Sequence, residues 1–148
     1  MQSGAFNAVR FVDFLVFNVL CGNVDAHSKN YSLLLQASGA VSMAPLYDVM
    51  NGDIYPDVTR NLAMKIAGKN RGHYIYARHW NRMAEENQLS AAQVRRRVGQ
   101  LSQAVLDALP SVVDELNALK KSAVYQADLR LHRRILPQRA EESGNRRQ

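Results

Sequence analysis

Two polar segments decide the fold of this chain: Gly22-Asn23-Val24-Asp25-Ala26-His27-Ser28-Lys29-Asn30 and Pro45-Leu46-Tyr47-Asp48. Between them, Leu33–Leu35 and Val41–Met43 are mostly apolar triplets that flank Ala37-Ser38-Gly39, a pattern typical of two short strands and a turn. A hairpin returns the chain to the edge from which it started. The sequence therefore predicts that Asp48 lies beside Asn30, close to the end of the first polar segment.

The residue types in these segments, and their order, are those that phosphoryl transfer needs. In that chemistry an Asp accepts the proton of the attacking hydroxyl, an Asn further along holds magnesium, and a second Asp after a hairpin holds the metal that bridges the phosphates. Two protein ligands suffice because Mg²⁺ keeps several waters and also binds nucleotide phosphates. The alternative is that Asp25 and Asn30 only cap a helix or a turn. The presence of His27, Lys29 and Asp48 in the same register favours the catalytic interpretation.

The two segments resemble the catalytic loop and the metal-binding segment of the HipA-type serine/threonine kinases, the toxin components of bacterial toxin–antitoxin pairs. The resemblance is carried by Asn23-x-Asp25-x-His27-x-Lys29-Asn30 and by Ala44–Val49. It continues more weakly in Asn61–Ile66, Ala77–Trp80 and Leu129–His132. It implies a mainly α fold with small β-hairpins, namely a protein-kinase-like C-terminal lobe of the HipA type.

By the same resemblance, the intact enzyme would transfer the γ-phosphate of ATP to a Ser or Thr of a protein substrate, with ATP and Mg²⁺ as cofactors. Asp25 would be the catalytic base, and Asn30 and Asp48 would hold Mg²⁺. His27 and Lys29 would lie beside the nucleotide phosphates, where Lys29 would neutralise charge that builds up during transfer. These five residues are the predicted catalytic and nucleotide-binding site.

A kinase also needs a second lobe, which covers the nucleotide with a Gly-rich or equivalent loop and supplies a strand lysine. The sequence contains no Gly-x-Gly, and few residues precede Gly22. We therefore expect the N-lobe to be absent from this chain. It is then a fragment of a longer kinase, a subunit completed by a separate polypeptide, or a truncated remnant, and alone it is expected to be inactive.

Composition is that of a globular domain, with 47% hydrophobic and 22% charged residues among 148. No apolar run approaches the roughly 20 residues that cross a bilayer, and no signal peptide is recognisable. The single cysteine, Cys21, excludes an intramolecular disulfide and is typical of a reducing compartment. We therefore expect a cytoplasmic protein without membrane contact. Residues 1–137 are predicted to form the lobe, and residues 138–148 a basic, disordered tail.

The formal net charge of +6 is unevenly distributed. Much of the excess lies near the C-terminus, and Arg95-Arg96-Arg97 forms another cluster. The simplest interpretation of these basic clusters is that they are solvated surfaces. The more specific one is that they contact DNA or a partner. The resemblance implies an antitoxin-like DNA-binding protein as partner. An alternative function is therefore a catalytically silent remnant that serves as a binding module for such a partner.

The rest of the chain is predicted to be mostly helical, apart from a second hairpin formed by Leu62–Ile66 and His73–Tyr76. Helices are expected over Phe6–Cys21, from Ala77 to near Gln88, from Ser90 to Pro110 and from Ser111 to Leu136. Pro110 should end the third of these helices, and Val112 should belong to the core side of the fourth.

In the third helix, the arginine cluster should point away from an apolar stripe formed by Val94, Val98, Leu101, Val105 and Leu109. His73, His79 and His132 lie far from any Cys or acid at metal-ligand spacing. They are therefore expected to be structural.

Overall fold

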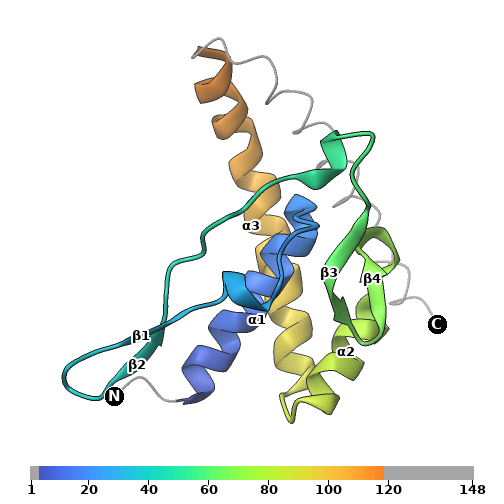
Figure 1. Ribbon diagram of the computed structural model, residues 1–148. Helices are drawn as coiled ribbons and strands as arrows, with labels where there is room; N and C mark the ends of the chain where they lie inside the picture. The colour runs from blue at the N-terminus through green and yellow to red at the C-terminus, as the bar shows by residue number, and fades with distance from the viewer. Residues whose placement is uncertain (1–3, 119–148) are drawn as a thin grey trace.

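A computed structural model of the protein describes residues 4–118. In this range the chain forms three helices and two separate two-stranded antiparallel sheets (Figure 1). The elements are α1 (Gly4–Cys21), β1 (Leu33–Leu35), β2 (Val41–Met43), β3 (Asn61–Ile66), β4 (Lys69–Arg71), α2 (Ala77–Glu86) and α3 (Ala91–Ala118). The predicted mainly helical fold with small hairpins is confirmed. Predictions for the chain beyond Ala118, including His132 and the tail at 138–148, lie outside the described residues.

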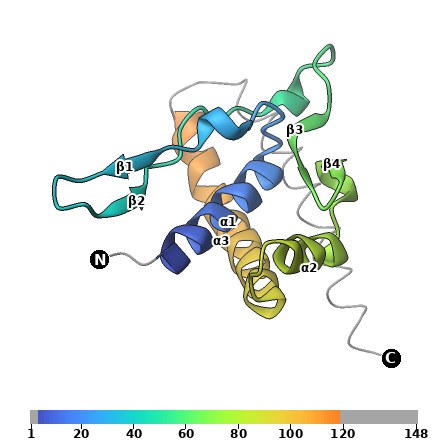
Figure 2. The ribbon, with the colours of Figure 1, turned by 60° about the horizontal axis from the view of Figure 1, so that its bottom comes forward.

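The long helices α1 and α3 lie side by side, and α2 packs against α3 near the start of that helix (Figures 1 and 2). The β3–β4 hairpin lies on one side of α1 next to α2. On the other side, β2 is bonded through Val41 and Met43 to Asn7 near the start of α1, and the tip of the β1–β2 hairpin extends away from the helices. None of the described helices is long and apolar enough to cross a membrane.

Helix α1 is the centre of the packing because apolar residues occur on almost all of its faces. Val12, Val16 and Leu20 are almost completely buried. The helix ends where Gly22 adopts a left-handed backbone with φ of +69°, a conformation that costs glycine little. The prediction of a central helix ended by this glycine is confirmed.

One core joins α1, β3, α2 and α3. Large side chains such as Ile75 and Trp80 are buried in it, and each contributes about 1.5–3 kcal/mol to folding. The predicted stripe of α3 faces this core. Its members Val94, Val98 and Leu109 are buried, and Leu101 and Val105 are partly buried.

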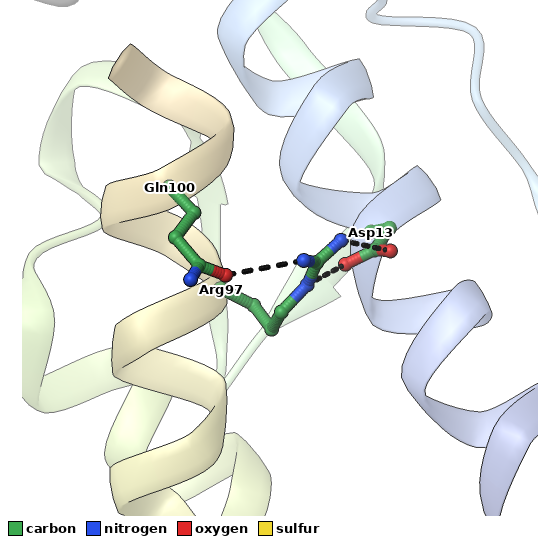
Figure 3. A network of polar contacts seen from close by, with 3 residues as sticks. All are labelled: Asp13, Arg97 and Gln100. Atoms are coloured by element: carbon green, nitrogen blue, oxygen red, sulfur yellow. Dashed lines mark hydrogen bonds and ion pairs between the residues drawn. The ribbon is translucent and has the colours of Figure 1, made fainter. Parts of the chain in front are cut away.

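An ion pair also links α3 to α1 (Figure 3). Arg97 donates from Nε and Nη2 to the two carboxylate oxygens of Asp13 at 2.8 and 2.6 Å, and from Nη1 to Gln100 at 3.1 Å. Its hydrogen bond to Asp13 raises the pKa of Arg97. Arg95 and Arg96 are exposed, as predicted. The prediction that Arg97 points away with them is wrong, because the residue turns toward a carboxylate on the neighbouring helix.

The first hairpin has the predicted strands, with Leu34 opposite Ser42 and Gly39 at φ of +79° in the turn. The second hairpin differs from the prediction. Ala67 and Gly68 both adopt positive φ, which is the requirement of a tight two-residue turn. The chain therefore reverses early and pairs β3 with Lys69–Arg71 rather than with His73–Tyr76.

The prediction that Pro110 ends a helix is also wrong, because α3 continues through it to Ala118. Proline removes one backbone hydrogen bond, and a helix can resume beyond it when the chain there favours helix. The hydroxyl of Ser111 donates to a carbonyl one turn earlier at 2.9 Å. Val112, predicted to lie in a core, is 43% exposed because this end of α3 extends beyond the packed elements.

Helix α2 begins at a hydrogen bond from the backbone N–H of Tyr76 to Nδ1 of His79 at 2.9 Å. A protonated Nδ1 could not accept this bond. Burial lowers the pKa of His79, and the positive charges of Arg78, Lys69 and Arg82 lower it further. His79 therefore has a structural role, as expected, and is held in its neutral form.

Acidification should weaken the fold through His79. Its folded pKa lies below that of an unfolded histidine, about 6.5, so below that pH the unfolded chain binds more protons than the folded chain. The stability that neutral His79 provides is lost as the pH falls from about 6.5 toward the lowered pKa. In urea unfolding, His79→Gln should lose less stability between about pH 7.5 and 5.5 than the unmutated chain, because glutamine accepts the Tyr76 bond without titrating. The exposed His73→Gln is the control, and the idea fails if both variants behave alike.

The segment that follows the first hairpin is fixed by close backbone contact. Gly52 donates its N–H to the carbonyl of Gly22 at 3.0 Å, and a Cβ at this glycine would overlap the side chain of Val24. Val24 is held from the other side as well, because Ala63 of β3 donates to its carbonyl at 2.8 Å. The loop after α1 is therefore held between the segment after β2 and the second hairpin.

Replacing Gly52 by alanine should separate these segments. The added methyl group meets the buried Val24, so Gly52→Ala should lower the free energy of unfolding by about 1–3 kcal/mol. Gly4→Ala is a matched control, because nothing lies within 4 Å of the position of its Cβ. The control should change stability by less than about 0.5 kcal/mol. Thermal or urea unfolding measures both, and equal stability of the two variants would disprove the close contact.

Candidate functional site

The first polar segment folds into a loop and a short 3-10 turn, Ser28–Asn30, directly after α1. Backbone bonds within the loop join the N–H of His27 to the carbonyl of Asp25 at 2.7 Å, and the N–H of Asn30 to the carbonyl of His27 at 3.0 Å. Asp25 is exposed at the surface, whereas Asn30 is only 5% exposed. A buried helix thus presents an accessible carboxylate on a loop of fixed shape.

The second polar segment is tied to the first by the end of the hairpin and by Tyr47. The N–H of Ala44 donates to the carbonyl of Ser32 at 2.8 Å. The Tyr47 hydroxyl donates to the carbonyl of Lys29 at 2.8 Å and lies 2.7 Å from Oγ of Ser32. Because a phenol has one proton to donate, Ser32 is the donor in the shorter contact. These bonds place the residue after Tyr47 next to the 3-10 turn.

Asn30 and Asp48 meet, as predicted. Nδ2 of Asn30 donates to a carboxylate oxygen of Asp48 at 3.0 Å and lies 3.4 Å from the backbone carbonyl of Asp25. One buried amide group therefore contacts both parts of the predicted site, although Asp48 is 18 residues away in the chain. Its nitrogen serves both contacts, and its Oδ1 takes part in neither.

The donors at this position fit a hard cation. Mg²⁺ prefers carboxylate and amide oxygens and usually keeps water or phosphate in its remaining positions. Asp48 and Asn30 offer one oxygen donor of each kind. Across residues 4–118 no group of three or more His, Cys, Asp or Glu side chains could hold a metal. The arrangement therefore suits an ion that is shared with a phosphate group better than one that is enclosed by protein.

His27 and Lys29 lie on the same loop. Nδ1 of His27 is buried and has no hydrogen-bond partner among the described residues. The Lys29 side chain is exposed, and its backbone carbonyl receives the Tyr47 hydroxyl. In the described part of the chain, neither side chain forms an ion pair with Asp25 or Asp48. The structure thus joins Asn30 to both acids, while the two basic side chains remain neighbours in the loop.

Sequence reasoning gave no role to a group of buried polar residues beneath the site. Asn23 donates from Nδ2 to Oδ1 of Asn18 at 2.9 Å and to the backbone carbonyl of Asp48 at 3.1 Å. Asn18 in turn donates to the hydroxyl of Tyr31 at 3.0 Å. The available signal was the occurrence of Asn18 in the second half of α1, which is otherwise apolar from Phe14 to Cys21, since a buried amide needs a partner.

Comparison with known proteins extends these observations. The family model described as "HipA-like C-terminal domain" matches residues 2–109. The chain is 33% identical over 115 residues to the Y4mE protein of Sinorhizobium fredii, covering 78% of this chain and 27% of that protein. It is 41% identical over 66 residues to the serine/threonine-protein kinase toxin HipA of Shewanella oneidensis, covering 45% of this chain and 15% of that protein.

A solved structure is similar as well. It is the complex of HipA, HipB and operator DNA from the toxin–antitoxin system of Shewanella oneidensis MR-1, matched with a TM-score of 0.72 and 28% identity. The match covers 84% of this chain and 30% of that chain. The present chain thus spans less than a third of each of these relatives. The resemblance found in the sequence is confirmed, and the chain belongs to the HipA-like C-terminal domain family.

Proposed function

We propose that this chain supplies the catalytic loop and the metal-holding segment of a HipA-type serine/threonine protein kinase. The observation that carries the proposal is the position of the Asn30 amide, which contacts the backbone of Asp25 and the carboxylate of Asp48. Positioning and electrostatics provide most of the catalysis in phosphoryl transfer. An amide that fixes one acid relative to another is therefore a feature that this reaction would use.

The proposed roles follow from exposure and donor type. Asp25 is exposed on a rigid loop, where its carboxylate can receive the proton of an incoming Ser or Thr hydroxyl. Asn30 and Asp48 would hold Mg²⁺ through an amide oxygen and a carboxylate oxygen. When bound there, Mg²⁺ would neutralise the phosphate charge of ATP. Lys29, with an exposed ammonium group on the same loop, would add positive charge, and His27 would lie beside it.

The complete activity belongs to a larger assembly in this proposal. The relatives extend well beyond the matched region, and this chain spans less than a third of their length. A nucleotide-covering lobe, provided by the same or another polypeptide, would hold the γ-phosphate in line with the hydroxyl. The toxin HipA, named as a serine/threonine-protein kinase, supports this choice of reaction.

Removing the proposed base should abolish most of the activity. In a protein that joins this chain to the nucleotide-binding lobe of a HipA-type kinase, Asp25→Asn should lower kcat by about 10²–10⁴-fold, the usual contribution of general-base catalysis. Asp48→Asn should raise the Mg²⁺ concentration needed for half-maximal rate. The exposed Asp114→Asn on α3 is the control. Phosphotransfer by Asp25→Asn within a factor of ten of the unmutated protein would refute the assignment of the base.

We further propose an antitoxin-like DNA-binding protein as partner, with DNA close to α3. The similar HipA structure contains HipB and operator DNA. In this chain, Arg95 and Arg96 are exposed on α3 and form no ion pair within residues 4–118. Arg97 is excluded from such a role because its guanidinium is bound to Asp13. If the complete protein proves inactive but binds this partner, the silent binding module becomes the better description.

Contact with DNA through α3 should be visible as salt dependence. Each phosphate neutralised by an arginine contributes about 0.9 to the slope of log K against log salt concentration. When the affinity of the protein for duplex DNA is measured, replacing Arg95 and Arg96 together by Gln should therefore reduce that slope by about two. Arg82→Gln is the matched control, because Arg82 is already paired with Glu86 at 2.7 Å. An unchanged slope in the double variant would rule out DNA contact through these two residues.

A further inference from the structure

The side chain of Asn23 connects three parts of the molecule that lie far apart in the chain. It is 1% exposed. Its Oδ1 accepts the backbone N–H of Asp25 at 3.2 Å, and its Nδ2 donates to Asn18 of α1 and to the backbone carbonyl of Asp48. One amide therefore binds the central helix, the backbone of the proposed base and the backbone of the proposed metal ligand.

Only one orientation of this amide satisfies its surroundings. The two groups that face Nδ2, namely Oδ1 of Asn18 and the carbonyl of Asp48, are acceptors, and the group that faces Oδ1 is the N–H donor of Asp25. Reversing the amide would replace the hydrogen bonds to Asp25 and Asp48 by repulsive contacts, because both partners are backbone groups that cannot exchange donor for acceptor. The backbone of Asn23 is also fixed, because its N–H donates to the carbonyl of Asn18 at 2.9 Å.

The contact with Asp48 falls on a backbone conformation that needs support. Asp48 has a φ of +56°, in the left-handed region that side-chain-bearing residues adopt at a cost of about 1–3 kcal/mol. Aspartate tolerates this region better than most residues, but surrounding contacts have to hold it there. The hydrogen bond from Asn23 fixes the peptide plane directly after the strained residue.

We propose that Asn23 is the positioning residue that sets the distance between Asp25 and Asp48. Its side chain binds both acids through their backbones, so it acts on the site without touching substrate, nucleotide or metal. Asn18 and Tyr31 extend the connection to the end of α1 and to the chain after the 3-10 turn. This inference rests on the proposed function, because it concerns the roles assigned there to the two acids.

Two substitutions separate the contacts of Asn23. Asn23→Ala removes all of them. Asn23→Asp, at about pH 7.5, keeps an oxygen that accepts from Asp25 but removes the donor to Asp48. The contact with α1 can be kept in this variant, since Asn18 can reverse its amide and the Tyr31 hydroxyl can donate instead of accept. Asn23→Asp therefore breaks mainly the connection to Asp48.

The experiment is NMR spectroscopy of the isotopically labelled 148-residue chain, first without metal and then with added Mn²⁺ as a paramagnetic probe. Without metal, Asn23→Ala should shift the Asp25 amide and the Asp48 carbonyl resonances, whereas Asn23→Asp should shift mainly the Asp48 carbonyl. Val98→Ala, a core substitution in α3, controls for a general loss of stability. It should leave both resonances in place.

With Mn²⁺, broadening should centre on Asn30 and Asp48, and its midpoint concentration should rise about tenfold or more in both Asn23 variants but not in Val98→Ala. The added carboxylate of Asn23→Asp would by its charge favour the cation, so weaker binding in that variant reports position. Unchanged Asp48 resonances, or midpoints equal to that of Val98→Ala, would overturn the inference. If the unmutated chain shows no broadening at Asn30 and Asp48, the proposed metal site is wrong, and the metal-free resonances alone decide the role of Asn23.

A measurement on the unmutated chain covers the case in which neither Asn23 variant folds. The side-chain amide protons of Asn23 are buried and donated to two carbonyl oxygens, so they should exchange with water at least about tenfold more slowly than those of the exposed Gln88. Equal exchange rates would contradict the inference.

Discussion

The burial of α1 is the constraint on which the rest of the structure depends. Its apolar faces are covered by α3 and β3, so neither the position nor the rotation of the helix can change without exposing core residues. The ion pair between Asp13 and Arg97 adds a directional contact to this packing. The packing of α1 therefore fixes the position at which the chain continues after Gly22. The loop that carries Asp25 is held in place by this buried helix, although the loop itself lies at the surface.

The site depends on a few directional bonds more than on burial. Tyr47, Asn30 and Asn23 each connect the loop after α1 with the segment around Asp48. Such bonds are individually worth only about 0.5–1.5 kcal/mol, but they fix geometry where the apolar core does not reach. A site of this kind can lose its arrangement while the fold persists. Stability and activity can therefore respond separately to mutations at these residues.

Much of this arrangement could be predicted because its signals are local in sequence. The apolar run of α1 and the turn around Gly39 each appear within a few consecutive residues, and the hairpin between Asn30 and Asp48 is a local pattern that predicts their contact. The errors have a different origin. The early turn at Ala67, the continuation of α3 through Pro110 and the contact of Arg97 with Asp13 depend on backbone conformation or on distant partners. The Asn18–Asn23 contact was missed although the two residues are only five positions apart, since a polar residue does not reveal in sequence which group it will meet.

The leucines of β1 have a practical consequence for work with this chain in solution. Leu33, Leu34 and Leu35 are all exposed, the last at 79%, because β2 is the strand of this ribbon that contacts α1, while β1 lies on the outside. The outer edge of β2 is occupied, because Asn7 of α1 bonds the carbonyl of Val41 and the N–H of Met43. The outer edge of β1 is therefore the one left for pairing, and apolar strand edges promote association between molecules. Association between folded molecules, rather than unfolding, would then limit the protein concentration at which the chain can be handled. Polar replacements of these leucines offer a way to raise that limit without touching the core.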